Sequence, residues 1–153
     1  MSMFENFVRE SNRIEGIQRD PTGAEIDAHV ALLDIAHLKT SDLEDFVDVV
    51  APGHRLRDKY GLDVRVGNHV APGGCPEIRQ TLDALLARVS EGETAYHPWQ
   101  CHIDYETLHP FTDGNGRSSR ALWLWQMQSA PIGFLHQFYY QTLSGIRRNE
   151  KAV

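Results

Sequence analysis

The chain has 153 residues, of which 41% are hydrophobic and 24% are charged, and its formal net charge is −6. That length suits one domain with a substantial hydrophobic core, and an acidic chain without a Lys/Arg run argues against a nucleic-acid partner. The two cysteines, Cys75 and Cys101, form neither a disulfide framework nor a zinc pattern, so we expect a reducing compartment. The first residues lack the pattern of a secretion signal, and no run is long and apolar enough to span a membrane. We therefore expect a single cytoplasmic domain over residues 1–153, with no membrane or nucleic-acid partner.

Residues 4–16 predict a short amphipathic helix. Its apolar side chains recur at helical spacing, and they are Phe4, Phe7, Val8 and Ile14. Gly16 would end the helix, because glycine is common just after the last helical residue. Taken alone, this is a terminal helix with a glutamate, Glu15, beside its final glycine.

Two further helices are predicted before residue 51. A turn at Asp20-Pro-Thr-Gly23 precedes a helix over residues 24–38. The side chains near one face of that helix are Ile26, Val30, Leu33 and His37. Ser41-Asp-Leu-Glu44 has the form of a capping box, and it would begin a helix that closes at Ala51-Pro-Gly.

Residues 62–71 change to the pattern of a β-hairpin. Leu62-Asp-Val-Arg-Val66 alternates, Gly67-Asn68 is a turn signal, and His69-Val70 returns along the second strand. This pattern does not distinguish a plain surface hairpin from a functional one.

The second half of the chain predicts four more helices. Pro76 would begin the first, whose core side consists of Ile78, Leu82, Leu85, Leu86 and Val89. Residues 94–108 would form the second, and residues 117–129 are apolar nearly all round, as a central buried helix should be. Ala130-Pro131 would separate that helix from a last one over residues 133–145. The predicted fold is therefore all-α, that is, mainly helical, with one small β-hairpin.

The histidines on these helices do not predict a metal site. His29 and His37 lack a partner at ligand spacing. His97 and His102 are five residues apart, whereas a helical zinc site has its histidines four apart. We expect all four to be ordinary structural residues.

The most informative stretch is His109-Pro-Phe-Thr-Asp-Gly-Asn-Gly-Arg-Ser-Ser-Arg120. Gly114 and Gly116 permit a positive φ and a close approach to a ligand, so that successive N–H groups can form a nest for phosphate oxygens. A helix that begins at Arg117 would add its free N–H groups and the positive end of its dipole. Arg117 and Arg120 share one helix face, and two guanidinium groups suit a polyphosphate. The stretch is predicted to be an anion-binding loop.

Three other side chains of this stretch have specific chemistry. Asp113 lies at the lip of the loop, where a carboxylate beside bound phosphates is a common ligand of Mg²⁺. The ordinary pKa of His109 suits the removal of a proton near neutral pH. Phe111 is predicted to anchor the loop to the core. The anion site would therefore contain its own general base.

His-Pro-Phe-x-Asp-Gly-Asn-Gly-Arg-x-x-Arg resembles the signature of the Fic family, which transfers AMP from ATP to protein hydroxyl groups. Each fixed position of that signature is filled between His109 and Arg120. The resemblance implies that ATP and Mg²⁺ bind here, with the metal on Asp113. The phosphates would be held by Gly114, Asn115, Gly116, Arg117 and Arg120. His109 would take the proton from a Tyr, Thr or Ser hydroxyl of a target protein.

Two earlier segments fit the same resemblance. Ser11-Asn-Arg-Ile-Glu15-Gly16 is similar to the inhibitory motif Ser/Thr-x-x-x-Glu-Gly/Asn of many Fic proteins, whose glutamate pairs with the second signature arginine, here Arg120. Glu15 would then occupy the charge partner that the γ-phosphate needs, and residues 4–16 would be an inhibitory helix. Residues 62–71 have the position of the flap, a hairpin that aligns an extended target segment by strand addition.

The resemblance leaves several activities open. The Doc branch transfers the γ-phosphate and has Lys where Gly116 stands here, so Gly116 favours AMP transfer. Members with the inhibitory glutamate can also remove AMP, in which case Glu15 would position a water. An ATP-sensing interaction protein with residual catalysis is an alternative from another class, and transfer of UMP or phosphocholine is also compatible with the loop. The sequence does not name the target, and self-modification and a homo-oligomer both remain open.

Overall fold

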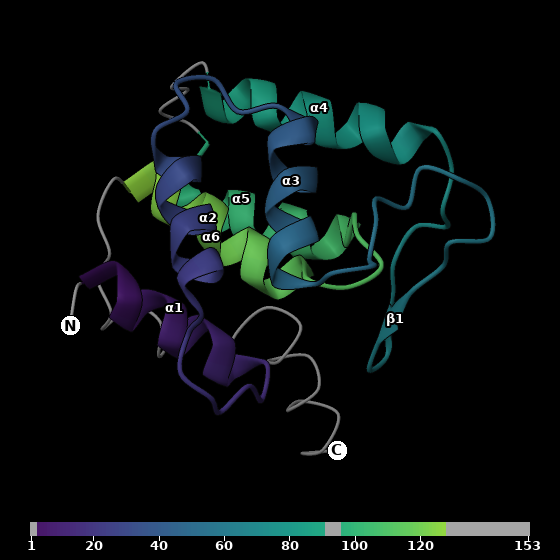
Figure 1. The fold of residues 1–153 in the computed structure, drawn as a ribbon. Coiled ribbons are helices and arrows are strands. Elements are labelled where there is room, and N and C mark those ends of the chain that lie inside the picture. Colours follow the sequence, from purple (N-terminus) through teal and green to yellow (C-terminus); the bar gives the residue numbers. More distant parts are fainter. Residues whose placement is uncertain (1–2, 91–95, 128–153) are drawn as a thin grey trace, which may run out of the picture.

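The computed structural model describes residues 3–90 and 96–127 (Figure 1). The elements in chain order are α1 (Met3–Ile14), α2 (Gly23–Leu33), α3 (Thr40–Val50), β1 (Arg65–Val66), β2 (His69–Val70), α4 (Glu77–Ser90), α5 (Pro98–Leu108) and α6 (Asn115–Met127). The two short strands pair antiparallel, with Arg65 opposite Val70 and Val66 opposite His69. The prediction of a mainly helical fold with one small β-hairpin is confirmed.

Helices α5 and α6 form the centre of the fold (Figure 1). Helix α6 packs against α5 and also against α1, α2 and α3, while α4 packs against α5 and α3. This position explains its composition, since the buried residues of its middle are Ala121, Leu122, Trp123 and Leu124. The prediction of a central buried helix is confirmed, although α6 begins at Asn115 rather than at residue 117. The core side predicted for α4 is also confirmed, because Ile78, Leu82, Leu85, Leu86 and Val89 are all buried.

Helix α1 ends in a Schellman motif that determines where Glu15 lies. The N–H of Gly16 donates to the carbonyl oxygen of Arg13, and the N–H of Ile17 donates to that of Asn12, both at 3.0 Å. Gly16 has a φ of 81°, a left-handed conformation in which a glycine avoids the clash of a Cβ. Gly16 therefore ends the helix as predicted, and it leaves Glu15 at the helix end.

Helix α2 differs from the prediction in its length and in its buried face. It ends at Leu33 instead of continuing to residue 38. Its buried residues are Glu25, His29 and Leu32, and not the predicted Ile26, Val30 and Leu33. Burial raises the pKa of Glu25, but the hydrogen bonds from Arg19, at 2.8 and 3.1 Å, together with those from Thr22 and the charge of Arg19, outweigh it and hold that pKa at about 2. A periodicity argument assigns the inward face to apolar residues, so it does not find a buried ion pair.

Helix α3 begins one residue before the predicted capping box. Its first residue is Thr40, and the N–H of Lys39 donates to Asp42 Oδ2 at 2.9 Å. The predicted pairing of Ser41 with Glu44 is therefore wrong, because both residues already lie inside the helix.

Helix α5 begins at Pro98 instead of residue 94. Proline is favoured in the first helical turn, since its missing N–H has no helical partner there, and His97 Nδ1 accepts the N–H of Trp99 at 3.1 Å. The predicted break at Ala130-Pro131 and the predicted helix over 133–145 lie outside the described residues. Within the two described ranges, no helix is both long enough and apolar enough to cross a membrane.

Candidate active site

The residues predicted for the anion site surround one cavity of about 670 Å³. Those from the α5–α6 loop and the first turns of α6 are His109, Asp113, Gly114, Asn115, Gly116, Arg117 and Arg120. Glu15 from the end of α1 and Arg65 from the hairpin line the same cavity. Small-molecule sites commonly measure about 300–1,000 Å³, so the space suits a nucleotide-sized ligand.

His109 follows α5 in a left-handed conformation, with φ 51° and ψ 62°. No other non-glycine residue of the described ranges has a positive φ, and such strain is often found where a side chain must be aimed. His109 Nδ1 lies 3.2 Å from the carbonyl oxygen of Glu106. A proton on Nδ1 would donate to that carbonyl and leave Nε2 to accept another. Burial lowers the pKa of His109 below its usual value, which favours the neutral imidazole.

Asn115 holds the loop in its shape. Its Oδ1 accepts the N–H of Phe111 and its Nδ2 donates to the carbonyl oxygen of Phe111, both at 2.8 Å. The Phe111 side chain is fully buried, and its backbone forms a β-bridge with Leu56. Both ends of the Asn115 carboxamide are thus bound to the Phe111 backbone. The contact of Asn115 with a phosphate stays a prediction.

Replacing Phe111 with alanine is expected to lower the free energy of unfolding by about 3–5 kcal/mol, because the ring is fully buried and its removal leaves a cavity. Urea unfolding of the two proteins measures the difference. Val70→Ala is the matched control, since Val70 is 67% exposed on the hairpin and its loss should cost less than about 0.5 kcal/mol. Equal stability of the two variants would contradict the anchoring role of Phe111.

The two glycines of the loop are needed for different reasons. Gly114 has a φ of 82°, as predicted. Gly116 lies inside α6 and does not have a positive φ, so that part of the prediction is wrong. A Cβ on Gly116 would lie only 2.7 Å from Glu15 Oε1 and 2.9 Å from Arg120 Nη1. The bare Cα of Gly116 therefore makes room for charged groups beside the first turn of α6.

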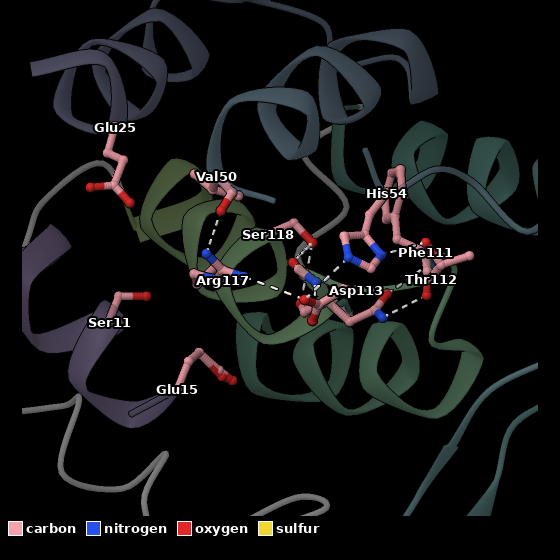
Figure 2. A network of polar contacts seen from close by, with 12 residues as sticks. Ser11, Glu15, Glu25, Val50, His54, Phe111, Thr112, Asp113, Arg117 and Ser118 are labelled. Atoms are coloured by element: carbon pink, nitrogen blue, oxygen red, sulfur yellow. Dashed lines mark hydrogen bonds and ion pairs between the residues drawn. The ribbon is translucent and has the colours of Figure 1, made fainter. Parts of the chain in front are cut away.

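Arg117 and Arg120 both line the cavity but have different neighbours. Arg117 donates from Nη1 to the carbonyl oxygen of Val50, at the end of α3 (Figure 2), and its buried Nε has no hydrogen-bond partner in the described part of the chain. Arg120 donates to Ser11 Oγ at 2.9 Å and to the Ser11 carbonyl oxygen at 3.0 Å, and its Nη2 lies 3.6 Å from Glu15 Oε2. Buried guanidinium groups with an unpaired donor suit an anionic ligand.

The Asp113 side chain reaches the cavity and is 58% exposed. Its Oδ1 accepts the N–H of Gly114 at 2.8 Å, and its Oδ2 lies 3.8 Å from His54 Nε2 and 3.9 Å from Arg117 Nη2 (Figure 2). Among the described residues, no group of three or more His, Cys, Asp or Glu could hold a metal ion. A metal at Asp113 would therefore take its other ligands from phosphate oxygens and water, which is how Mg²⁺ is usually bound.

A comparison with protein families agrees with this geometry. The model of the Fic/DOC family matches residues 29–127, which include the cavity loop and all elements from α3 to α6. The chain belongs to the Fic/DOC family. Members of this family are typically transferases that act on proteins, and they generally use ATP and Mg²⁺. No solved structure matches the chain.

Helix α1 lies outside the matched part of this Fic/DOC chain, yet it contacts the cavity loop. Ser11 is fully buried against Arg120, and the Glu15 side chain, 31% exposed, reaches the same guanidinium. Figure 2 shows Ser11 and Glu15 on the last turn of α1 and just beyond it. Asn12 Nδ2 donates to Glu25 Oε2 on α2 at 3.4 Å, which helps to hold α1 in place. The structure thus brings together Glu15 and Arg120, which are far apart in the sequence of the Fic/DOC chain.

Three residues near the Fic/DOC site escaped the sequence prediction. His54 Nδ1 is 2.9 Å from Thr112 Oγ1 in the loop, and Arg57 Nε donates to the carbonyl oxygen of His109 at 2.7 Å. Glu106 lines the cavity, and burial raises the pKa of its carboxyl to about 7. His54 and Arg57 belong to no sequence motif that would have indicated them. Glu106 lies one helical turn before His109, and this spacing is the signal that could have indicated it.

Proposed function

We propose that this Fic/DOC chain is a protein adenylyltransferase, which transfers AMP from ATP to a Tyr, Thr or Ser hydroxyl of a target protein and releases pyrophosphate. The observation that carries the proposal is the position of His109 in the same cavity as Asp113, Arg117 and Arg120. A neutral imidazole beside a set of anion-binding groups supports the transfer of a group from a polyphosphate to a hydroxyl.

The start of α6 would hold the triphosphate of ATP. The free N–H groups and the positive dipole end of the helix favour negative charge there, and Gly116 leaves the space that a phosphate needs. Arg117 and Arg120 would neutralise the charge that develops on the leaving pyrophosphate. Mg²⁺, when bound at Asp113, would neutralise further phosphate charge while it keeps several water ligands.

The transfer itself needs one base. We assign His109 Nε2 to take the proton of the target hydroxyl while the hydroxyl oxygen bonds to the α-phosphorus. The bond from that phosphorus to the bridging oxygen of the pyrophosphate breaks, and its electron pair leaves with the pyrophosphate. The Glu106 carbonyl, which accepts from Nδ1, would keep the ring oriented and stabilise the imidazolium that forms.

The hairpin would present the target. An extended segment of a target protein can add to one of its edges through main-chain hydrogen bonds, which demand little of the target's side chains. Val64, Arg65 and Val66 line the cavity, so a segment paired along β1 would lie near His109. The same argument permits self-modification, in which a second copy of the chain supplies the segment.

Glu15 is proposed to inhibit this activity. Its carboxylate lies 3.6 Å from Arg120 Nη2, and its Oε1 lies where a Cβ on Gly116 would clash. A terminal phosphate at that place would meet the like charge of Glu15, which already lies against the Arg120 guanidinium. ATP would then bind only with its phosphates displaced, and withdrawal of Glu15 would restore the productive position.

AMP removal is a second candidate activity, favoured by the presence of the Glu15 carboxylate in the same cavity as His109. With AMP on a target hydroxyl, Glu15 would position a water for attack on the phosphorus. A protein labelled by a Glu15→Gly variant would lose the label when mixed with the unsubstituted chain if this activity is present.

The position of a radioactive label distinguishes AMP transfer from phosphate transfer. We expect that the Glu15→Gly variant, incubated with Mg²⁺ and ATP labelled on the α-phosphate, incorporates the label into itself or into proteins of a cell extract. ATP labelled on the γ-phosphate should give no incorporation, because that phosphate leaves in pyrophosphate. Intact mass spectrometry of the variant would show an added adenylate. Incorporation of the γ label alone would replace the proposal with a phosphotransferase.

A further inference from the structure

Arg57 is a fully buried residue in the segment between α3 and the hairpin, and it does not line the cavity. Its guanidinium donates to four backbone carbonyl oxygens. Removing a guanidinium from water costs free energy, and the hydrogen bonds to these four carbonyl oxygens offset that cost. The four acceptors belong to two features of the fold, the turn at His109 and the two ends of the hairpin.

One set of contacts fixes the turn that contains His109. Arg57 Nη2 donates to the carbonyl oxygen of Leu108 at 2.9 Å, Arg57 Nε to that of His109 at 2.7 Å, and the Arg57 backbone N–H to that of Pro110 at 2.8 Å. Three successive carbonyl groups are therefore bound by one residue. They belong to the end of α5, where the helix dipole favours a cation, and to the left-handed turn at His109.

The other set of contacts fixes the two ends of the hairpin. Arg57 Nη1 donates to the carbonyl oxygen of Leu62 at 3.0 Å and to that of Pro72 at 2.7 Å. These residues stand before β1 and after β2, so both ends of the flap meet at the same guanidinium. The carbonyl oxygen of Arg57 also accepts the N–H of Cys75 at 3.1 Å.

We propose that Arg57 is a positioning residue, which sets the imidazole of His109 relative to the flap so that a hydroxyl presented by the flap reaches it. The inference rests on the proposed function, because it assigns the flap to the target and the imidazole to the proton. Arginine is required since its planar fork presents five N–H donors in fixed directions, whereas lysine offers three donors at one point. Lysine would keep the charge but could not bind both ends of the flap and the turn together.

The test compares Arg57→Lys and Arg57→Met in the Glu15→Gly background. Arg79→Lys is the matched control, because Arg79 is also an arginine with several partners, but these are Glu44 and Asp58. We expect Arg57→Lys to lower the rate of AMP incorporation roughly 10- to 100-fold, with the affinity for ATP changed less than about threefold, since a misplaced base affects the transfer and not the nucleotide. The control should keep a rate within about twofold of its parent.

The pH dependence of the rate separates positioning from a general loss of structure. Burial is the main cause that lowers the pKa of His109. Arg57 and His69 lower it further, whereas the Glu106 carbonyl raises it, as does Glu15, which is absent from the test background. Arg57→Met removes a positive charge and should raise the pKa of His109. As the pH is lowered, the rate of this variant should therefore begin to fall at a higher pH than the rate of the Glu15→Gly parent. Arg57→Lys keeps the positive charge, so its rate should begin to fall at the same pH as that of the Glu15→Gly parent.

The possible outcomes are distinct. If the Glu15→Gly parent incorporates no AMP, the proposed function fails, and the inference about Arg57 fails with it. If the parent is active and Arg57→Lys matches Arg79→Lys in rate, Arg57 is not a positioning residue, although the proposed function stands. If Arg57→Met unfolds, as a melting curve would show, the rate and ATP affinity of Arg57→Lys decide the matter.

Discussion

Replacing His109 with alanine is expected to lower the rate of AMP transfer by roughly 10²- to 10⁴-fold, the usual contribution of a general base. The Nδ1 of His109 is engaged by the Glu106 carbonyl, which leaves its Nε2 to accept a proton. The affinity for ATP should change little, because the triphosphate would be held by the start of α6 and not by His109. The measurement is incorporation of α-labelled ATP, with ATP binding followed by calorimetry, in the Glu15→Gly background.

His37→Ala is the control for this experiment. His37 is exposed and does not line the cavity, so its loss should leave both transfer and ATP affinity unchanged. A His109→Ala variant that transfers AMP at the parent's rate would exclude the assigned role. A variant that loses ATP binding as well would show instead that His109 acts on the shape of the loop.

The Glu15→Gly variant is expected to transfer AMP about 10- to 100-fold faster than the unsubstituted chain, the range of coupling between sites that compete through one group. The pair is 3.6 Å apart and Glu15 is 31% exposed, so its direct stabilisation of the fold is small. Its effect on activity should be larger, because the carboxylate is proposed to occupy the place of a terminal phosphate beside Arg120. Initial rates of AMP incorporation at saturating ATP measure the gain.

Glu10→Gln is the matched control for this second experiment. It removes a carboxylate from the same helix, one that pairs with Arg13 rather than with the cavity. The control should transfer AMP at the slow rate of the unsubstituted chain. Equal rates for the Glu15→Gly variant and the control would remove the inhibitory role of Glu15 and leave the transfer proposal intact.

The parts of the site that could be predicted from sequence are those in which the types of residue and their spacing along the chain indicate a structure or a chemical role. The twelve residues from His109 to Arg120 predicted a loop before a buried helix, and the structure has one. The motif around Glu15 predicted a pair with Arg120, and the two residues are in contact. The buried face of α4 could be predicted from the helical spacing of its apolar residues, because the residues that are buried all fall on one side of the helix.

The parts that could not be predicted depend on partners outside the helix or motif from which the prediction was made. Burial of Glu25 requires Arg19 and Asn12, and no periodicity of α2 contains that information. The role of Arg57 could not be predicted either. Its acceptors are backbone carbonyl oxygens, which every residue has, so no residue type indicates them. A positive φ at Gly116 was predicted from residue type, whereas the structure requires a missing Cβ for reasons of space.

The crowding at Gly116 has a consequence for how such a chain can diverge. Any side chain at this position would enter the volume now filled by the Glu15 carboxylate and the Arg120 guanidinium. A lysine at this position would therefore displace the Glu15 carboxylate or the Arg120 guanidinium, and either move would disturb the contact between them. A descendant that acquired the lysine would then also rearrange the contact through which Glu15 is proposed to inhibit, because both charged ends lie beside the Cα of residue 116.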